Sequence, residues 1–240
     1  MKYISTRGNY KKVTSAEAIK LGMVPEGGLF VPEKIPQLSM KEILRKKNEN
    51  YRDITNWILK YFLSDYNSQE IEEAVNKAYS IDNFPVNMKT PLKKLEDNIY
   101  IMELWHGPTA AFKDLALQIM PYLLLNAIKK TQSKKDIVIL VATSGDTGKA
   151  ALEGFKNIEG IKIIVFYPEK GVSKIQKDQM LTTEGNNTEV VSIEGNFDDC
   201  QNAVKKVFSD SVFNKKINKN GYEFSSANSI NWGRLLPQIV

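Results

Sequence analysis

The sequence predicts a three-layer α/β fold, in which helices cover both faces of a parallel β-sheet, preceded by a mostly helical N-terminal region. Three runs rich in β-branched residues, IVILVAT (137–143), IKIIVFY (161–167) and TEVVSI (188–193), alternate with helical segments. Such runs are typical of strands buried on both faces, and strands separated by helices pair in parallel through right-handed crossovers. The first third of the chain instead carries apolar residues at helical spacing.

The composition is that of an average soluble globular protein. Apolar residues make up 42% and charged residues 25% of the 240 residues, with a net charge of +5, which excludes disorder, long coiled coils and disulfide frameworks. The lone Cys200 cannot form an internal disulfide, and the lone His106 excludes multi-histidine metal sites and the common zinc clusters. We therefore expect no metal, and a reducing, cytoplasmic compartment.

Neither a membrane nor nucleic acid is an expected partner. No apolar run approaches the roughly 18 residues that a membrane-spanning helix requires. Basic pairs such as Lys46-Lys47 and Lys134-Lys135 are scattered along the chain, which favours solvated surface lysines over a phosphate-binding stripe. The positive charge remains compatible with a small anionic ligand, and the oligomeric state has no signal in the sequence.

The N-terminal region carries start and stop signals for helices. Ser15 to Leu21 is predicted to be a short helix that Gly22 ends, and Ser39 with Glu42 forms a capping box that opens another. The spacing of apolar residues predicts further helices, and a stretch rich in Gly and Pro predicts turns around one short strand. The predicted helices span 15–21, 39–47, 53–63 and 68–79, and the turns with their strand span 24–36.

The remaining elements follow the alternation of strands and helices. A short strand is predicted at 99–103, and the segment 114–129 is apolar nearly all round, which indicates a buried helix that Pro121 bends. Helices are also predicted from about 147, from 173 and over 198–209. The segment 232–240 is predicted to be a helix without a glycine cap or polar stop, so we expect that the chain is truncated inside it.

Lys113 is the first candidate for chemistry. It lies in ELWHGPTAAFKDLALQ (103–118), where a turn of small residues enters the buried helix. A lysine there either extends its ammonium group to solvent or is held in an apolar site that favours the neutral amine. A neutral amine can attack an aldehyde and form a Schiff base. The nearby His106 is either a base or, more commonly, a hydrogen-bonded structural histidine.

The turn VATSGDTGKA (141–150) is a second candidate, because it follows the strongest strand and opens a helix. Its small residues allow backbone N–H groups to converge on an anion at the helix N-terminus. Open parallel sheets also bind ligands at the carboxyl ends of their strands. Thr143 and Ala150 stand where a Walker A loop requires other residues, which argues against a nucleoside-triphosphate loop. The alternative is an ordinary capped β–α turn.

A third candidate is FSSANSINWGR (224–234), a run of short hydrogen-bonding side chains followed by an arginine. Asn228 and Ser229 supply polar groups, and Arg234 supplies a guanidinium one turn into the next helix. This combination suits a phosphate. An N-capped helix start is the alternative.

Together these segments resemble the threonine synthases, pyridoxal-phosphate (PLP) enzymes of fold type II in the tryptophan-synthase-β-like group. The resemblance covers essentially the whole chain in order, and ELxHGPTxAFKD is specific to threonine synthases within that group. The matching segments are STRG (5–8), GGLFVP (27–32), ELWHGPTAAFKD (103–114), ATSGDTG (142–148), YPEKGVSKIQKDQM (167–180) and SSANSINWGRLLPQ (225–238).

The resemblance implies four regions along the chain. Residues 1–95 would form the N-terminal threonine-synthase region, and 96–135 part of the large PLP domain that carries Lys113. Residues 136–222 would form a small α/β domain, and 223–240 a segment that returns to the large domain.

The resemblance also implies roles for individual residues. Lys113 would be the catalytic lysine that forms a Schiff base with PLP, and Asp146 would bind the cofactor. Many fold type II enzymes carry Asn at the position of Asp146, and Lys149 replaces the small residue that usually follows SGDTG, which puts direct contacts there in doubt. The implied substrate-binding residues are Ser144, Thr147, Asn228, Ser229 and Arg234.

The implied reaction is that of a carbon–oxygen lyase acting on a phosphate: O-phospho-L-homoserine and water give L-threonine and phosphate, the last step of threonine biosynthesis. Members of the family are longer, so the 240-residue chain itself is expected to be poorly active. A related fold type II lyase, such as a threonine or serine dehydratase, would share the lysine but would not need the phosphate-binding residues. A non-catalytic threonine-synthase-like protein that binds a phosphorylated ligand is the other alternative.

Overall fold

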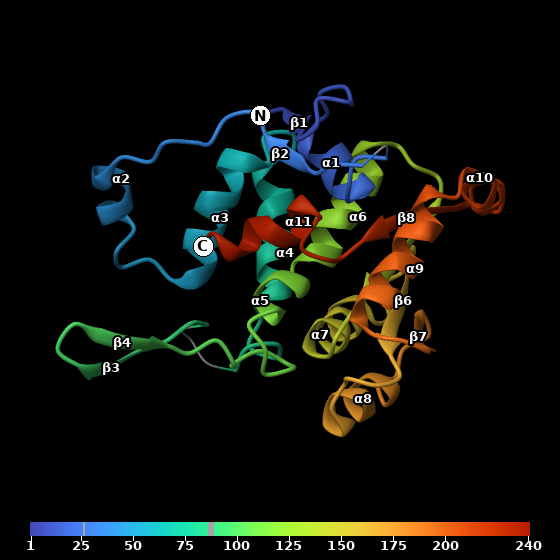
Figure 1. The fold of residues 1–240 in the computed structure, drawn as a ribbon. Helices are drawn as coiled ribbons and strands as arrows, with labels where there is room; N and C mark the ends of the chain where they lie inside the picture. The colour runs from blue at the N-terminus through green and yellow to red at the C-terminus, as the bar shows by residue number, and fades with distance from the viewer. Residues whose placement is uncertain (26, 86–88) are drawn as a thin grey trace.

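A four-stranded parallel sheet forms one end of the molecule (Figure 1). The computed structural model describes residues 1–25, 27–85 and 89–240. The sheet has the order β7-β6-β5-β8, and all three neighbouring pairs are parallel. Its strands are β5 (Asp136–Ala142), β6 (Ile161–Pro168), β7 (Thr188–Ile193) and β8 (Tyr222–Ser226). The three strands predicted from β-branched runs are thereby confirmed, as is the parallel α/β class.

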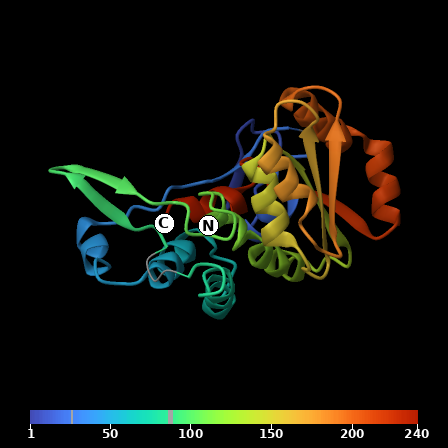
Figure 2. The ribbon, with the colours of Figure 1, turned by 90° about the horizontal axis from the view of Figure 1, so that it is seen from below.

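Helices pack on both faces of this sheet, as the apolar strands predict (Figure 2). Side chains alternate along β5, so Ile137 and Ile139 face the larger core with α7 (Asp146–Phe155), while Val138 and Leu140 face a second cluster. That second cluster includes Cys200 and Val204 of α9 (Phe197–Ser209). The remaining helices of this part are α8 (Lys174–Leu181) and α10 (Ser211–Lys219).

The N-terminal region is mostly helical, as predicted. Its helices are α1 (Ser15–Leu21), α2 (Met40–Arg45), α3 (Tyr51–Phe62) and α4 (Ser68–Ala78), and an antiparallel pair joins β1 (Tyr3–Ser5) to β2 (Phe30–Pro32). The Ser39–Glu42 capping box is present, and Gly22 caps α1 with a φ of +75°. The helix α1 packs on α6 (Met120–Lys130) and thereby attaches this region to the rest of the fold.

The segment predicted as one bent helix over 114–129 forms two helices. The first, α5 (Asp114–Leu117), ends before α6 begins at Met120. Pro121 has no N–H to donate to the Leu117 carbonyl, so the helical ladder cannot continue there, and proline is favoured in the first turn of the new helix instead.

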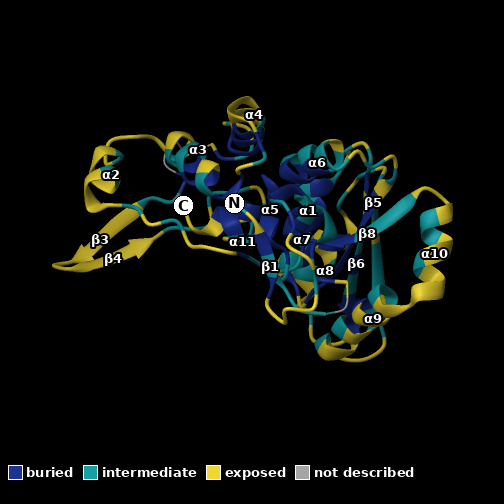
Figure 3. Ribbon diagram, turned by 90° about the horizontal axis from the view of Figure 1, so that it is seen from above, coloured by how far each residue is buried: buried dark blue, intermediate teal, exposed yellow. Residues whose placement is uncertain are grey.

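Some elements differ from the prediction because their sequence signals are weak. The expected strand at 99–103 is β4 (Ile99–Met102), but it pairs with an unpredicted strand, β3 (Leu92–Glu96), whose sequence LKKLE carries no strand pattern. Both strands are exposed along their whole length and project from the end of the molecule opposite the sheet (Figure 3). The helix α10 was also not predicted.

The C-terminal segment differs in two ways. The strand β8, which includes the polar sequence FSS, was not predicted, and it pairs in parallel with β5. The single helix expected over 232–240 is instead a short helix, α11 (Trp232–Leu235), followed by a 3₁₀ turn (Leu236–Gln238) that contains Pro237. Among the described residues, no helix combines the length and apolar character needed to cross a membrane.

A close approach between α5 and α7 fixes the position of the segment that carries Lys113. A Cβ added to Gly154 of α7 would lie 2.1 Å from the Leu117 carbonyl oxygen at the end of α5. Only glycine permits this distance, and the carbonyl concerned belongs to the backbone, which cannot rotate away as a side chain can.

We predict that Gly154→Ala lowers the free energy of unfolding by about 2 kcal/mol, because α5 must move away from α7. Urea unfolding followed by circular dichroism measures this change. Gly233→Ala is the matched control, since it also lies in a helix and its added Cβ would meet only side-chain atoms, of Ile19 at 3.1 Å and of Asn231 at 3.4 Å. Equal effects of the two substitutions would contradict a special contact at Gly154.

Candidate active site

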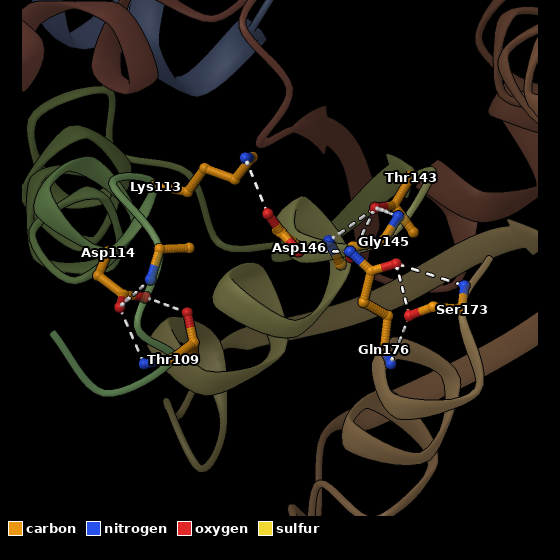
Figure 4. A network of polar contacts seen from close by, with 10 residues as sticks. Thr109, Lys113, Asp114, Thr143, Gly145, Asp146, Ser173 and Gln176 are labelled. Carbon is orange, nitrogen blue, oxygen red and sulfur yellow. Dashed lines mark hydrogen bonds and ion pairs between the residues drawn. The ribbon is translucent and has the colours of Figure 1, made fainter. Parts of the chain in front are cut away.

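Lys113 lies at the start of α5, and its side chain extends toward the N-terminus of α7 (Figure 4). Its Nζ lies 3.5 Å from Oδ2 of Asp146 and 4.3 Å from the centre of the Phe112 ring. The Lys113 side chain is 19% exposed, whereas that of Asp146 is 47% exposed. The structure therefore brings together the two predicted cofactor residues, from segments 33 positions apart, with the amine partly shielded from water.

The turn that leads into Lys113 converges on the buried carboxylate of Asp114. One carboxylate oxygen accepts from the Thr109 N–H at 2.8 Å, and the other accepts from the Thr109 hydroxyl at 2.6 Å. The N–H of Ala111 lies at the limit of hydrogen bonding, 3.5 Å away. Burial raises the pKa of Asp114, while the hydrogen bonds from Thr109 oppose that shift. Asp114 and Lys113 point in different directions in Figure 4.

The loop between β5 and α7 is held by the hydroxyl of Thr143. This buried oxygen accepts from the backbone N–H of Gly145 at 3.0 Å and of Gly148 at 2.9 Å. Gly145 has a φ of +149°, a backbone conformation that favours glycine, and a Cβ there would collide with Gln176. Gln176 in turn donates to Oδ1 of Asp146 at 2.6 Å. The loop therefore presents Asp146 to Lys113 in one defined orientation.

Four other predicted residues line a single cavity of about 430 Å³ at the carboxyl ends of β5 and β8. They are Ser144, Thr147, Asn228 and Ser229. Lys205 of α9 also lines this cavity and is its cationic residue. Sequence reasoning missed Lys205, because nothing in the amphipathic pattern of α9 shows which of its lysines faces the sheet edge.

Asn228 uses its side chain to extend the pairing of β5 with β8. Its amide accepts from the N–H of Ala142 at 3.3 Å and donates to the carbonyl of the same residue at 2.9 Å. Asn228 therefore shapes the wall of the cavity and has fewer groups left to bind a ligand.

Arg234 lies outside this cavity. Its side chain is only 2% exposed, and its Nε and Nη1 atoms have no hydrogen-bond partner within the described ranges. Burial lowers the pKa of Arg234 to about 10, and the nearby Asp114 carboxylate opposes that shift. The structure thus places this guanidinium in the interior, on the side of Asp114.

His106 is hydrogen-bonded, as expected for a structural histidine. Its Nε2 lies 2.6 Å from Oε2 of Glu103, and both side chains are largely buried. In the part of the chain that the structure describes, no three His, Cys, Asp or Glu side chains are placed to hold a metal ion.

Comparison with family models assigns both parts of the chain. Residues 2–79 match the threonine synthase N terminus, and residues 84–239 match the pyridoxal-phosphate dependent enzymes. The chain belongs to the pyridoxal-phosphate dependent enzyme family. The resemblance to threonine synthases inferred from the motifs is thereby confirmed, and the cofactor of this family is PLP.

Individual relatives agree with this assignment. The chain is 37% identical over 241 residues to a threonine synthase from Pseudomonas aeruginosa, and 40% identical over 234 residues to threonine synthase-like 1 from Homo sapiens. These matches cover 100% and 94% of the chain, and 50% and 31% of the relatives. The chain therefore spans at most half the length of these two relatives.

Solved structures confirm fold type II. A threonine synthase from Brucella melitensis, described as PLP-bound, superposes with a TM-score of 0.87 and 35% identity. The threonine synthase from Escherichia coli gives a TM-score of 0.86 and 32% identity. Each comparison covers 100% of this chain, with 50% of the first structure and 52% of the second.

The residues present fit the aldehyde end of PLP. An amine is the group that condenses with an aldehyde, and the Lys113 amine is partly shielded and held 3.5 Å from a carboxylate. The adjacent loop 143–148 opens α7, whose N-terminus favours anionic groups. Lys113 and Asp146 are thus the residues of this chain that would hold the reactive end of the cofactor.

We predict that Thr143→Val destabilises the protein by about 2 kcal/mol, because the N–H groups of Gly145 and Gly148 lose their shared acceptor. Thr143→Ser is the matched control, since it keeps the hydroxyl and should retain most of the wild-type stability. Chemical denaturation of both variants measures the difference. A stable valine variant would show that the hydroxyl does not hold the loop.

Proposed function

We propose that this chain carries out, or forms part of the protein that carries out, the threonine synthase reaction, in which O-phospho-L-homoserine and water give L-threonine and phosphate. The observation that carries the proposal is the partly shielded Lys113 amine facing Asp146, beside the loop that also lines the cavity at the sheet edge. Similarity to threonine synthases over the whole chain supports the substrate assignment.

Lys113 is proposed to act as the base and acid of the reaction. When bound, PLP supplies an electron sink that stabilises negative charge on the carbon next to the substrate amino group. The Lys113 amine, directed by Asp146, removes the proton from that carbon and later moves protons at the neighbouring carbons. A proton-transfer group must lie within hydrogen-bond reach of the atom it serves, and the restrained turn before α5 limits where this amine can go.

The cavity is proposed to hold the two anionic ends of the substrate. Ser144 and Thr147 lie at the N-terminus of α7, where hydroxyl groups and the helix dipole favour a carboxylate. Ser229 and Lys205 line the same cavity and would bind the phosphate, which gains negative charge as it leaves. Arg234, buried next to Asp114, would then contribute through the field inside the protein and not by contact with the phosphate.

A non-catalytic protein that binds a phosphorylated ligand is the second candidate. The chain is 40% identical to human threonine synthase-like 1, a relative that is not named a threonine synthase. Both candidates require the anion site, but only the enzyme requires the amine of Lys113, so the two can be separated by experiments on that residue.

We predict that Lys113→Ala abolishes specific attachment of PLP. The protein is incubated with one equivalent of PLP, reduced with borohydride and digested, and the modified lysine is identified by peptide mapping. Lys149→Ala is the matched control, because Lys149 is 18% exposed and also paired with a carboxylate, Glu153. Modification that persists at the wild-type level in the Lys113 variant would place the reactive amine elsewhere.

We also predict that the protein binds O-phospho-L-homoserine more tightly than L-homoserine or L-threonine. Lys205→Ala should weaken binding of the phosphorylated compound about tenfold, because a charge-assisted contact is lost. Lys206→Ala is the control, since Lys206 is the next residue on α9 and does not line the cavity. Isothermal titration calorimetry measures these affinities.

Tighter binding of L-threonine than of O-phospho-L-homoserine would favour the dehydratase alternative over a threonine synthase.

A further inference from the structure

A single carboxylate holds the turn that precedes Lys113. It belongs to Asp114, the residue that follows the lysine. Asp114 is fully buried and accepts hydrogen bonds from the N–H and the hydroxyl of Thr109. Ala110, the residue after Thr109, has a φ of +55°, a backbone conformation that L-amino acids rarely adopt. The turn therefore depends on contacts that compensate for this backbone conformation.

Packing against Asp114 restricts the backbone conformations that the turn can adopt. A Cβ added to Gly107 would lie 2.5 Å from both Cβ and Oδ2 of Asp114, so the backbone of Gly107 rests directly on the carboxylate. On the other side of the segment, α5 is held against α7 through the contact between Leu117 and Gly154. Lys113 thus lies between two restrained points and can adjust mainly through its own side chain.

A buried guanidinium, that of Arg234, lies near the Asp114 carboxylate. The guanidinium of Arg234 lies close enough for the two charges to interact, although the described residues show no direct ion pair between them. Two nitrogens of Arg234 lack hydrogen-bond partners within those residues. A buried cation is costly unless an opposite charge is near, and the Asp114 carboxylate opposes the burial that lowers the pKa of Arg234.

We propose that Asp114 is a positioning residue for Lys113: by gathering Gly107, Thr109 and Ala111 around its carboxylate, it aims the lysine amine at Asp146. This inference rests on the proposed role of Lys113. Asp114 itself points away from the amine (Figure 4), so it acts through the backbone of the turn and not on the reacting atoms.

The test compares the wild type, Asp114→Asn and Asp114→Ala. Each protein is incubated with one equivalent of PLP and reduced with borohydride, and the labelled lysines are identified. Asparagine keeps an acceptor for the Thr109 N–H, whereas alanine removes every acceptor. We expect the fraction of label on Lys113, relative to the other lysines, to fall in the order wild type, Asn, Ala, with about a tenfold loss for alanine. Asp199→Asn is the control, because Asp199 also accepts from a backbone N–H at a helix start, in α9.

A second variant separates positioning from folding. Thr109→Val removes the 2.6 Å hydrogen bond with little change in shape, and Thr109→Ser retains it, so serine should restore labelling at Lys113 while valine lowers it. Circular dichroism reports whether each variant is folded. Unchanged labelling at Lys113 in folded Asp114 and Thr109 variants would overturn the inference and leave the proposed function intact. Absence of preferential labelling at Lys113 in the wild type would instead overturn the proposed function.

Discussion

The candidate site depends on the close approach of two helix starts, α5 with Lys113 and α7 with Asp146. Neither residue could keep its orientation alone, because a lysine has four rotatable bonds and Asp146 is half exposed. The approach of the two helices is fixed where Gly154 of α7 leaves room for the Leu117 carbonyl at the end of α5. Pro121 contributes as well, because it ends α5 and leaves that carbonyl without a donor in its own helix.

The loop 143–148 connects this pair to the cavity at the sheet edge. Asp146 turns toward Lys113, while Ser144 and Thr147 line the cavity. The position of the loop follows from topology, since the carboxyl ends of neighbouring parallel strands meet at one edge. Asn228 joins that edge from β8 by bonding to the backbone of Ala142 in β5. A cofactor held at Lys113 and a substrate in the cavity would therefore share one rigid loop, which supports the threonine synthase proposal.

The sequence predicts the buried parts of this fold better than the exposed parts. The strands β5, β6 and β7 follow from β-branched runs, and α1 from its glycine stop, because these local signals agree with the tertiary structure. The strand β3 has no such signal, since LKKLE is exposed on both faces. For the candidate site, motif resemblance selected Lys113 and the loop 143–148, and the structure places the Lys113 amine 3.5 Å from Asp146 of that loop. The resemblance could not show that Arg234 is buried or that Lys205 lines the cavity, because side-chain direction depends on packing between distant segments.

The most direct test of the account is a crystal structure of the protein grown with PLP. The account predicts continuous electron density between Nζ of Lys113 and the cofactor, with Asp146 and the loop 143–148 beside it. Density for the cofactor at another lysine, or a Lys113 side chain turned to solvent and away from the loop, would contradict it.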